Sequence, residues 1–212
     1  MHAMKTESQL SQPTNATAAC FDRLARDGRA LQFKADDGPR LERLQSRLGD
    51  LRGLRVLEPG CGAGPLTAHL SRWVEPGGAV HAFDPSPAML QLCRQAIGGR
   101  ANVRLTEVSC EDATWPAGGF DRVICFRVWP HFTMPAVVPS RFARWLRPGG
   151  RLHIVHWQGR AALAAVHNTE AALAGHVLPS AEAFAAVLRD HGFRVVTAID
   201  TADEFYLEAL RE

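Results

Sequence analysis

Glycine stands at every second position in the stretch Gly60-Cys61-Gly62-Ala63-Gly64, and the acid Glu58 lies two residues before the first glycine. An apolar run ends at Leu57 and an amphipathic pattern begins at Leu66, which predicts a buried strand, a tight turn and a helix. This unit opens nucleotide-binding α/β sheets, because glycines let the backbone approach a ligand closely. The spacing G-x-G-x-G differs from that of dinucleotide sites, and the carboxylate would repel a pyrophosphate but attract an ammonium group. The turn therefore favours S-adenosylmethionine over NAD.

A second acid, Asp84, ends the predicted strand 79–84 and lies 20 residues beyond Gly64. At this interval an acidic side chain reaches the ribose hydroxyls of a nucleotide in a βαβ unit. Ser86 is a typical helix N-cap, and Pro87 suits the first helical position. The sequence thus predicts a carboxylate between strand and helix, beside the glycine turn.

Four histidines are candidates to converge at one edge of the sheet: His131, His156, His167 on the stripe of the next helical segment, and His176 just before Leu178-Pro179. His131 comes after the strand 120–126 and His156 ends the strand 151–157, so both belong to the carboxyl edge of a parallel sheet. Together they predict a general base or an acceptor-orienting group, to which we assign His131, His156 and His167. A zinc or iron site is a less favoured hypothesis. Each histidine alone also fits a surface or core role.

The elements expected to position these residues alternate along the chain. Two helices, at about 18–33 and 39–49, precede the first strand, and they form a lid or pack on the sheet edge. Strands are expected near 54–57, 79–84, 103–108, 120–126, 151–157, 193–199 and 204–210, with helices between most of them. The last two strands are joined by a short turn, which requires an antiparallel hairpin.

Composition limits the function classes. The 212 residues suit one globular domain with 46% hydrophobic and 22% charged residues. The net charge is +2, and Lys and Arg are spread along the chain without forming blocks, which argues against nucleic acid as a partner. No apolar run is long enough for a membrane span, and the five cysteines lack a C-x-x-C pair, so we expect a cytoplasmic protein with reduced thiols. We divide the chain into a disordered tail (1–16), N-terminal helices (17–50) and a ligand-binding domain (51–212).

From about residue 50 to the end, the chain resembles the class I S-adenosylmethionine-dependent methyltransferases, of the small-molecule type with a type 11/25-like domain. Five matching segments occur in the family's order: 58–64, Asp84, 111–113, 120–124 and 146–150. The resemblance implies an α/β fold, a Rossmann-like three-layer sandwich. Its seven-stranded sheet is mostly parallel, with an antiparallel C-terminal strand.

The resemblance also implies a cofactor site. Glu58 would face the ammonium group, the backbone of Gly60, Cys61, Gly62 and Gly64 would line the same end, and Asp84 would hold both ribose hydroxyls. The remaining assignments are Pro85 and Met89 on the adenine face, Asp112 and Ala113 on the adenine edge with Glu111 beside them, and Phe126 and Arg127 after the fourth strand. Each acid could instead be a helix-terminal or solvent-facing carboxylate.

The implied reaction is methyl transfer to a small-molecule acceptor. The segment Phe126-Arg127-Val128-Trp129-Pro130-His131-Phe132 lacks the Asn/Asp/Ser-Pro-Pro signature of enzymes that methylate exocyclic amines, so base methylation is not expected. If Trp129 or Phe132 faces the pocket, a flat apolar acceptor is favoured. Alternatives are an RNA- or protein-directed methyltransferase, a non-catalytic binder of S-adenosylmethionine or S-adenosylhomocysteine, and, more distantly, an NAD-dependent oxidoreductase. We expect a monomer or homodimer without membrane partners.

Overall fold

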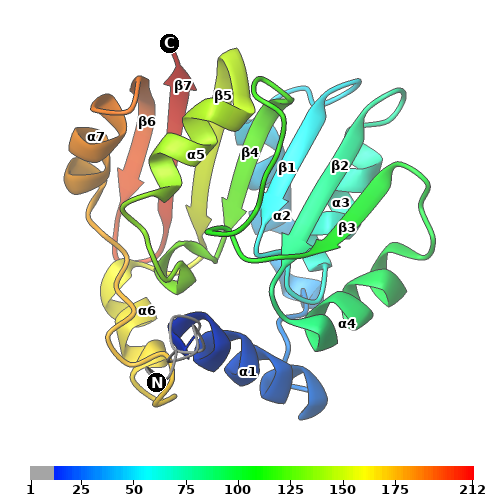
Figure 1. Cartoon of the computed structure of the whole chain (residues 1–212), viewed down its shortest axis with the longest axis vertical. Coiled ribbons are helices and arrows are strands. Elements are labelled where there is room, and N and C mark those ends of the chain that lie inside the picture. The colour runs from blue at the N-terminus through cyan, green and yellow to red at the C-terminus, as the bar shows by residue number, and fades with distance from the viewer. Residues whose placement is uncertain (1–11) are drawn as a thin grey trace, which may run out of the picture.

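The computed structural model describes residues 12–212, with side chains from residue 16 onward, and shows one sheet between two layers of helices (Figure 1). The sheet has seven strands in the order β3-β2-β1-β4-β5-β7-β6. All neighbouring strands are parallel except β7, which is antiparallel to both β5 and β6. The predicted three-layer α/β fold and its C-terminal antiparallel hairpin are confirmed.

The first half of the chain is a series of strand–helix units. Ser86 caps α4 as the sequence predicts, since its hydroxyl accepts a hydrogen bond from the Met89 amide at 3.1 Å. Pro87 occupies the first turn of that helix. The elements are β1 (Arg55–Pro59), α3 (Pro65–Trp73), β2 (Ala79–Asp84), α4 (Pro87–Ile97), β3 (Val103–Glu107) and β4 (Phe120–Phe126).

The second half completes the sheet. The Ser180 hydroxyl accepts from the Ala183 amide and caps α7, also as predicted. The elements are η2 (Trp129–His131), α5 (Val138–Trp145), β5 (Leu146–His156), α6 (Arg160–His167), α7 (Ala181–Arg189), β6 (Phe193–Asp200) and β7 (Phe205–Arg211). β5 begins five residues before the predicted Arg151, because Leu146 already pairs with Phe120 across a register irregularity.

The N-terminal helices differ from their predicted bounds. The helix α1 spans Gln12–Arg26 and not 18–33, because Gly28 at φ +69° ends it and its amide donates back to the Ala25 carbonyl. Residues 1–11 of the predicted tail lie outside the described residues. A short 3-10 turn, η1 (Ala35–Asp37), then leads into α2 (Gly38–Leu48), close to its predicted position.

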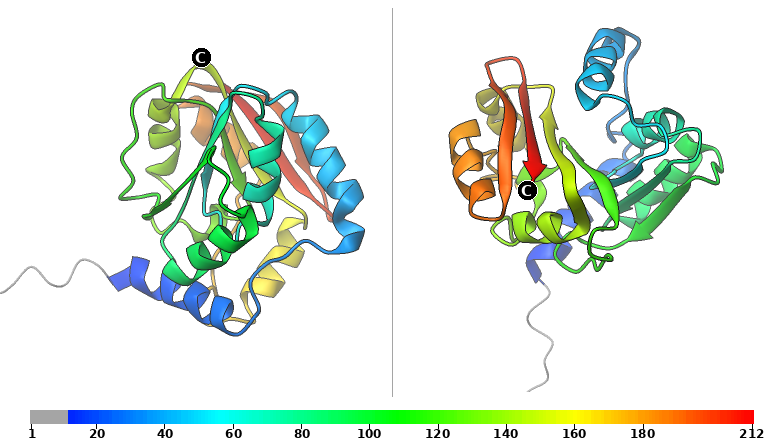
Figure 2. Two further views of the ribbon diagram at one scale, coloured as in Figure 1. Left: turned by 90° about the vertical axis from the view of Figure 1, so that its right-hand side faces the viewer. Right: turned by 90° about the horizontal axis from the view of Figure 1, so that it is seen from above.

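Helices cover both faces of the sheet, as the two further views show (Figure 2). On one face α5 and α7 contribute Phe142, Trp145 and Leu188 to a buried cluster. On the other face α2, α3 and α4 bury Leu44, Leu70 and other apolar side chains. Within residues 12–212, no helix combines the length and apolar character needed to span a bilayer.

The helix α1 packs on neither face but crosses the carboxyl ends of the parallel strands, beside α4 and α6 (Figure 1). Its Asp22 carboxylate accepts from the Ser86 hydroxyl at 2.5 Å and from the Ala88 amide at 3.1 Å. Two arginines, Arg23 and Arg29, approach the Glu170 carboxylate at 2.9 and 2.8 Å. These contacts hold α1 over the edge where β1 and β4 diverge, which is the usual ligand position in such sheets.

Candidate active site

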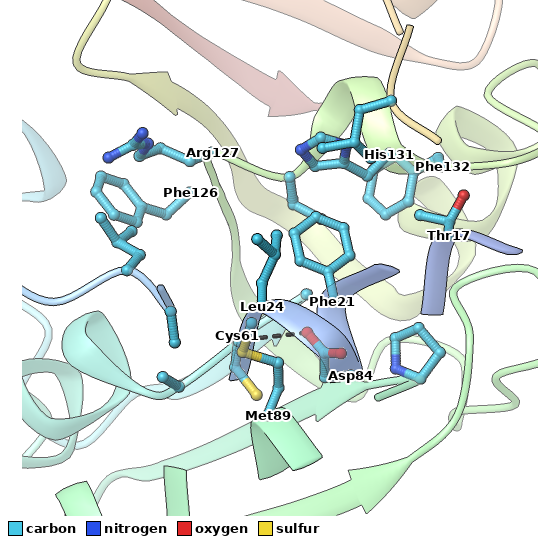
Figure 3. Close-up of a pocket in the computed structure, with 18 of the residues that line it drawn as sticks. Thr17, Phe21, Leu24, Cys61, Asp84, Met89, Phe126, Arg127, His131 and Phe132 are labelled. Carbon is cyan, nitrogen blue, oxygen red and sulfur yellow. Dashed lines mark hydrogen bonds between the residues drawn. The ribbon is translucent and has the colours of Figure 1, made fainter. Parts of the chain in front are cut away.

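A cavity of about 360 Å³ lies under α1, at the carboxyl ends of β1, β2 and β4 (Figure 3). The glycine turn after β1 and Asp84 after β2 form one side of it. His131 and Phe132, after β4, lie on the other side, and Phe21 and Leu24 project between them from α1. The cavity therefore collects segments that are far apart in the sequence.

The glycine turn adopts the left-handed conformation at each of its three glycines, with φ values of +64° at Gly60, +54° at Gly62 and +81° at Gly64. The Cys61 amide donates to the Phe83 carbonyl at 3.1 Å, which ties the turn to β2. The Gly62 amide donates to Asp84 Oδ2 at 2.9 Å, shown as the dashed line in Figure 3. The predicted glycines and the predicted acid are thus in direct contact.

Two of these glycines differ in what a side chain would meet. A Cβ at Gly60 would overlap the Val128 side chain, whereas a Cβ at Gly62 meets nothing within 4 Å. We predict that Gly60→Ala lowers the free energy of unfolding by about 2–4 kcal/mol, from left-handed strain and overpacking together. Gly62→Ala, the matched control, should lower it by about 1–2 kcal/mol from strain alone. Urea denaturation measures both, and equal losses would contradict the steric argument.

Asp84 is buried, with 8% of its surface exposed, and each carboxylate oxygen accepts one backbone amide. The Gly62 amide contacts Oδ2, and the Ser86 amide contacts Oδ1 at 2.9 Å. Burial raises the pKa of Asp84 to about 6, and the two amide donors oppose that rise. The amides fix the carboxylate at the cavity wall, where both oxygens keep lone pairs for further donors.

Glu58 lies deeper, at the end of β1, with 2% of its surface exposed. The Thr67 hydroxyl donates to its Oε2 at 2.7 Å, and burial raises its pKa well above the ordinary value. Within residues 16–212, no salt bridge neutralises this carboxylate. A cationic group in the cavity would reduce that cost, which fits the ammonium predicted from the sequence.

The loop after β3 places its two acids differently. Glu111 lines the cavity, and its Oε1 accepts the amides of Thr133 and Met134 at 2.6 and 3.0 Å. Asp112 is exposed and accepts the Ser109 hydroxyl at 2.7 Å, outside the cavity wall. The Ala113 amide already donates to the Ser109 carbonyl at 3.0 Å. The adenine contacts assigned to Asp112 and Ala113 therefore stay predictions, and Glu111 is the acid in the wall.

The other predicted cofactor residues line the cavity: Pro85, Met89, Phe126 and Arg127. Arg127 has a positive φ of 55°, and its amide donates to the Val155 carbonyl at 2.8 Å. This turn of the backbone directs the segment from Arg127 to His131 along the cavity. Burial lowers the pKa of the Arg127 guanidinium.

Three of the four histidines come together. The Nδ1 atoms of His131 and His176 are 3.1 Å apart, and the His131 and His167 ring centroids are 4.8 Å apart. His131 and His167 line the cavity. Burial, and then the charges of His167 and His176, lower the pKa of His131 well below its ordinary value. At neutral pH this imidazole is uncharged and able to accept a proton.

The sequence predicted His156 in the site, but the structure does not place it in the cavity wall. It is 1% exposed, and neither of its ring nitrogens has a hydrogen-bond partner among the described residues. Strand alternation puts it on the same face as Ile154, under α5 and α7. Burial lowers its pKa to about 3. Within residues 12–212 no three His, Cys, Asp or Glu side chains are placed to bind a metal ion.

The sequence predicted that the N-terminal helices act as a lid and help to form the acceptor pocket, but it named none of their residues as part of the site. Thr17, Phe21 and Leu24 line the cavity, and the Phe21 ring lies edge-on to the His131 ring at 5.0 Å. The stripe of Phe21 and Leu24 was visible in the sequence, but the same stripe would serve a helix packed on the sheet. Glu170, in the segment after α6, was also missed and lines the cavity.

Comparisons with known proteins find methyltransferases. Residues 56–150 match the family described as methyltransferase domain. A ubiquinone biosynthesis O-methyltransferase from Xanthomonas oryzae pv. oryzae (strain PXO99A) is 34% identical over 130 residues, which are 60% of this chain and 53% of that protein. The chain therefore spans about half the length of the curated relatives it matches.

Two solved structures show the same fold. A SAM dependent methyltransferase from Aquifex aeolicus has a TM-score of 0.67 and 21% identity, covering 92% of this chain and 98% of that one. The [4+2]-cyclase SpnF has a TM-score of 0.64 and 17% identity, covering 81% and 80%. At such identities the likeness extends to the fold alone, and these two proteins carry different names for their reactions.

Proposed function

We propose that this chain is a class I S-adenosylmethionine-dependent methyltransferase that methylates a hydroxyl group of a small, flat, largely apolar acceptor. Residues 56–150 match the family described as methyltransferase domain, which supports this proposal. The donor is S-adenosylmethionine, as the sequence predicts. One observation carries the proposal: an uncharged imidazole, His131, lines the same cavity as Asp84 and the glycine turn. The O-methyltransferase name of the relatives supports oxygen as the methylated atom.

The donor side of the cavity fits S-adenosylmethionine. Asp84 offers two fixed oxygens for a pair of ribose hydroxyls, and Glu58 is a buried acid without a salt bridge among the side chains described from residue 16 onward. Open space lies beside the Cα of Gly62, where a ligand can approach the backbone. A methyl group activated by a sulfonium is the chemistry that this cofactor supplies when bound, so the protein mainly has to align the acceptor.

The acceptor side is lined by rings and aliphatic side chains. Phe132 lines the cavity, whereas Trp129 is buried in the core with its ring 4.7 Å from Phe184. Phe21 covers the space from α1, and Leu163 and Leu173 add apolar surface from the α6 region. An aromatic acceptor would bury its faces against such side chains. His131 would take the hydroxyl proton as the oxygen attacks the methyl carbon.

Two other functions remain to be tested against this one: a binder without turnover, and methylation of RNA or protein. Calorimetry with S-adenosylmethionine tests binding. Turnover is tested by S-adenosylhomocysteine release with phenol, catechol and hydroquinone, and with cell extract divided by an ultrafilter. We expect release with a phenol and with the small-molecule filtrate. Binding without release by any fraction would indicate a non-catalytic binder, and release with the retained macromolecules alone would overturn the small-molecule assignment.

The remaining expectations accompany this proposal. We propose that α1 and the following segment act as the lid predicted for 17–50, because Asp22, Arg23 and Arg29 join them to both sides of the cavity. The five cysteines are buried free thiols, which supports the cytoplasmic location expected from the sequence. The monomeric or homodimeric state stays a prediction.

A further inference from the structure

His176 lies in the segment between α6 and α7, outside the residues that match the methyltransferase domain. Both imidazoles are half-buried, but His131 lines the cavity and packs edge-on against Phe21 of the overlying helix, whereas His176 lies outside the cavity lining. The two imidazoles meet through their Nδ1 atoms at 3.1 Å. A hydrogen-bond path thus runs from the base in the cavity to a histidine that reaches solvent.

The position of His176 is fixed by a third histidine. His167 Nδ1 is 2.8 Å from the His176 carbonyl oxygen, and a carbonyl can only accept, so His167 carries its proton on Nδ1. His167 is 4% exposed and part of α6, which makes it a rigid anchor for the loop that holds His176. The direction of proton transfer therefore depends on which of the two Nδ1 atoms, that of His131 or that of His176, carries the proton they share.

We propose that His176 is the proton exit of this enzyme. In the resting state His131 donates Nδ1–H to His176 Nδ1, and His131 Nε2 keeps a lone pair for the acceptor hydroxyl. As the acceptor oxygen bonds to the methyl carbon, the sulfur keeps the electron pair of the broken bond and the hydroxyl proton moves to His131 Nε2. The Nδ1 proton of His131 passes to His176 Nδ1, and His176 releases its Nε2 proton to water. This inference rests on the proposed function.

The surroundings of His131 explain why the proton must leave. The ring packs beside His167 and His176, and charges on these two, on His156 and on Arg127 oppose a cation there. Burial is the largest contribution to its lowered pKa, and Phe21 of α1 packs edge-on against the ring. Burial and then the charge of His167 also lower the pKa of His176, whereas the pKa of His131 is lowered well below its ordinary value. A proton is therefore held more easily on His176 than on His131.

Two substitutions separate proton transfer from positioning. His176→Asn keeps an acceptor near the Nδ1 position but has no second nitrogen to release a proton, whereas His176→Ala keeps neither. His191→Asn is the control, since this histidine lies in the turn after α7, where its Nδ1 is 2.8 Å from the Val187 carbonyl oxygen. We expect kcat with the best phenol acceptor to fall by about 10–100-fold in both His176 variants, with KM unchanged. Added imidazole should restore His176→Ala.

Nitrogen-15 NMR of the ligand-free protein gives a readout independent of activity. We expect His131 protonated on Nδ1 in the wild type and in His176→Asn, and a mixture of tautomers in His176→Ala. Wild-type kcat in His176→Asn would overturn proton exit and leave a positioning role, and an Nε2-protonated His131 in the wild type would overturn the direction of the path. If the wild type methylates no acceptor, the proposed function fails, while the NMR result still decides the proton arrangement.

Discussion

Asp84→Asn is expected to weaken S-adenosylhomocysteine binding by at least about 100-fold, because it would remove the charged acceptor that we assign to two ribose hydroxyls. Each hydrogen bond to a charged group contributes about 1.5–3 kcal/mol, and about 1.4 kcal/mol is tenfold in affinity. The asparagine nitrogen would also face the amide of Gly62 or Ser86, both of which donate to the present carboxylate. Isothermal calorimetry measures the loss, and circular dichroism verifies that the variant is folded.

The control is Asp190→Asn, at the exposed C-terminal end of α7, which should bind as the wild type does. If Asp84→Asn lowers the affinity for S-adenosylhomocysteine by less than about threefold, the effect is far smaller than the loss of two charged hydrogen bonds would cause, which would contradict the ribose assignment.

The pH dependence of binding follows from the same carboxyl. Its pKa is raised to about 6 in the ligand-free protein, so protons compete with the ligand below that pH. Wild-type affinity should fall by about tenfold per pH unit below 6, and the slope should be shallower in Asp84→Asn. The raised pKa also means that the folded state binds this proton more tightly than the unfolded chain. Asp84 therefore lowers the stability of the ligand-free protein as the pH rises from about 4 to about 6.

The sequence predicted that Asp84 lies beside the glycine turn because local rules place both. Strand β2 ends at Asp84 and the next residues cap a helix, so the acid had one position available. The glycines after β1 fix the turn that Asp84 contacts. The fold followed from the same alternation of apolar runs and turns, since the crossover between two parallel strands is almost always right-handed.

The acceptor side depends on tertiary contacts that no local pattern contains. His156 was expected in the site because it ends a strand, but the end of a strand specifies an edge of the sheet and not a face. Glu111 and Asp112 are adjacent, and the Ser109 hydroxyl decides which one turns outward. Phe21 reaches the cavity because α1 is bound at Ser86 and Glu170, residues distant from it in sequence.

His131→Ala is expected to lower kcat by about 10²–10⁴-fold while S-adenosylhomocysteine affinity stays within about twofold of wild type, the loss typical of a removed general base. The His131 imidazole contacts Phe21, His167 and His176. Its loss should therefore leave the glycine turn, and with it cofactor binding, unchanged. Weakened cofactor binding would contradict this assignment. The control is His69→Ala, whose ring contacts Phe33 and Trp73 away from His131.

The pH profile of this variant distinguishes a base from an orienting group. A phenol ionises more as the pH rises, so without a base the rate should increase about tenfold per pH unit up to the acceptor pKa. A more acidic phenol should likewise lose less activity in His131→Ala than phenol itself. A group that only orients the acceptor would instead raise KM and leave the shape of the profile unchanged. Because burial keeps His131 uncharged down to low pH, the wild-type rate should depend only weakly on pH near neutrality.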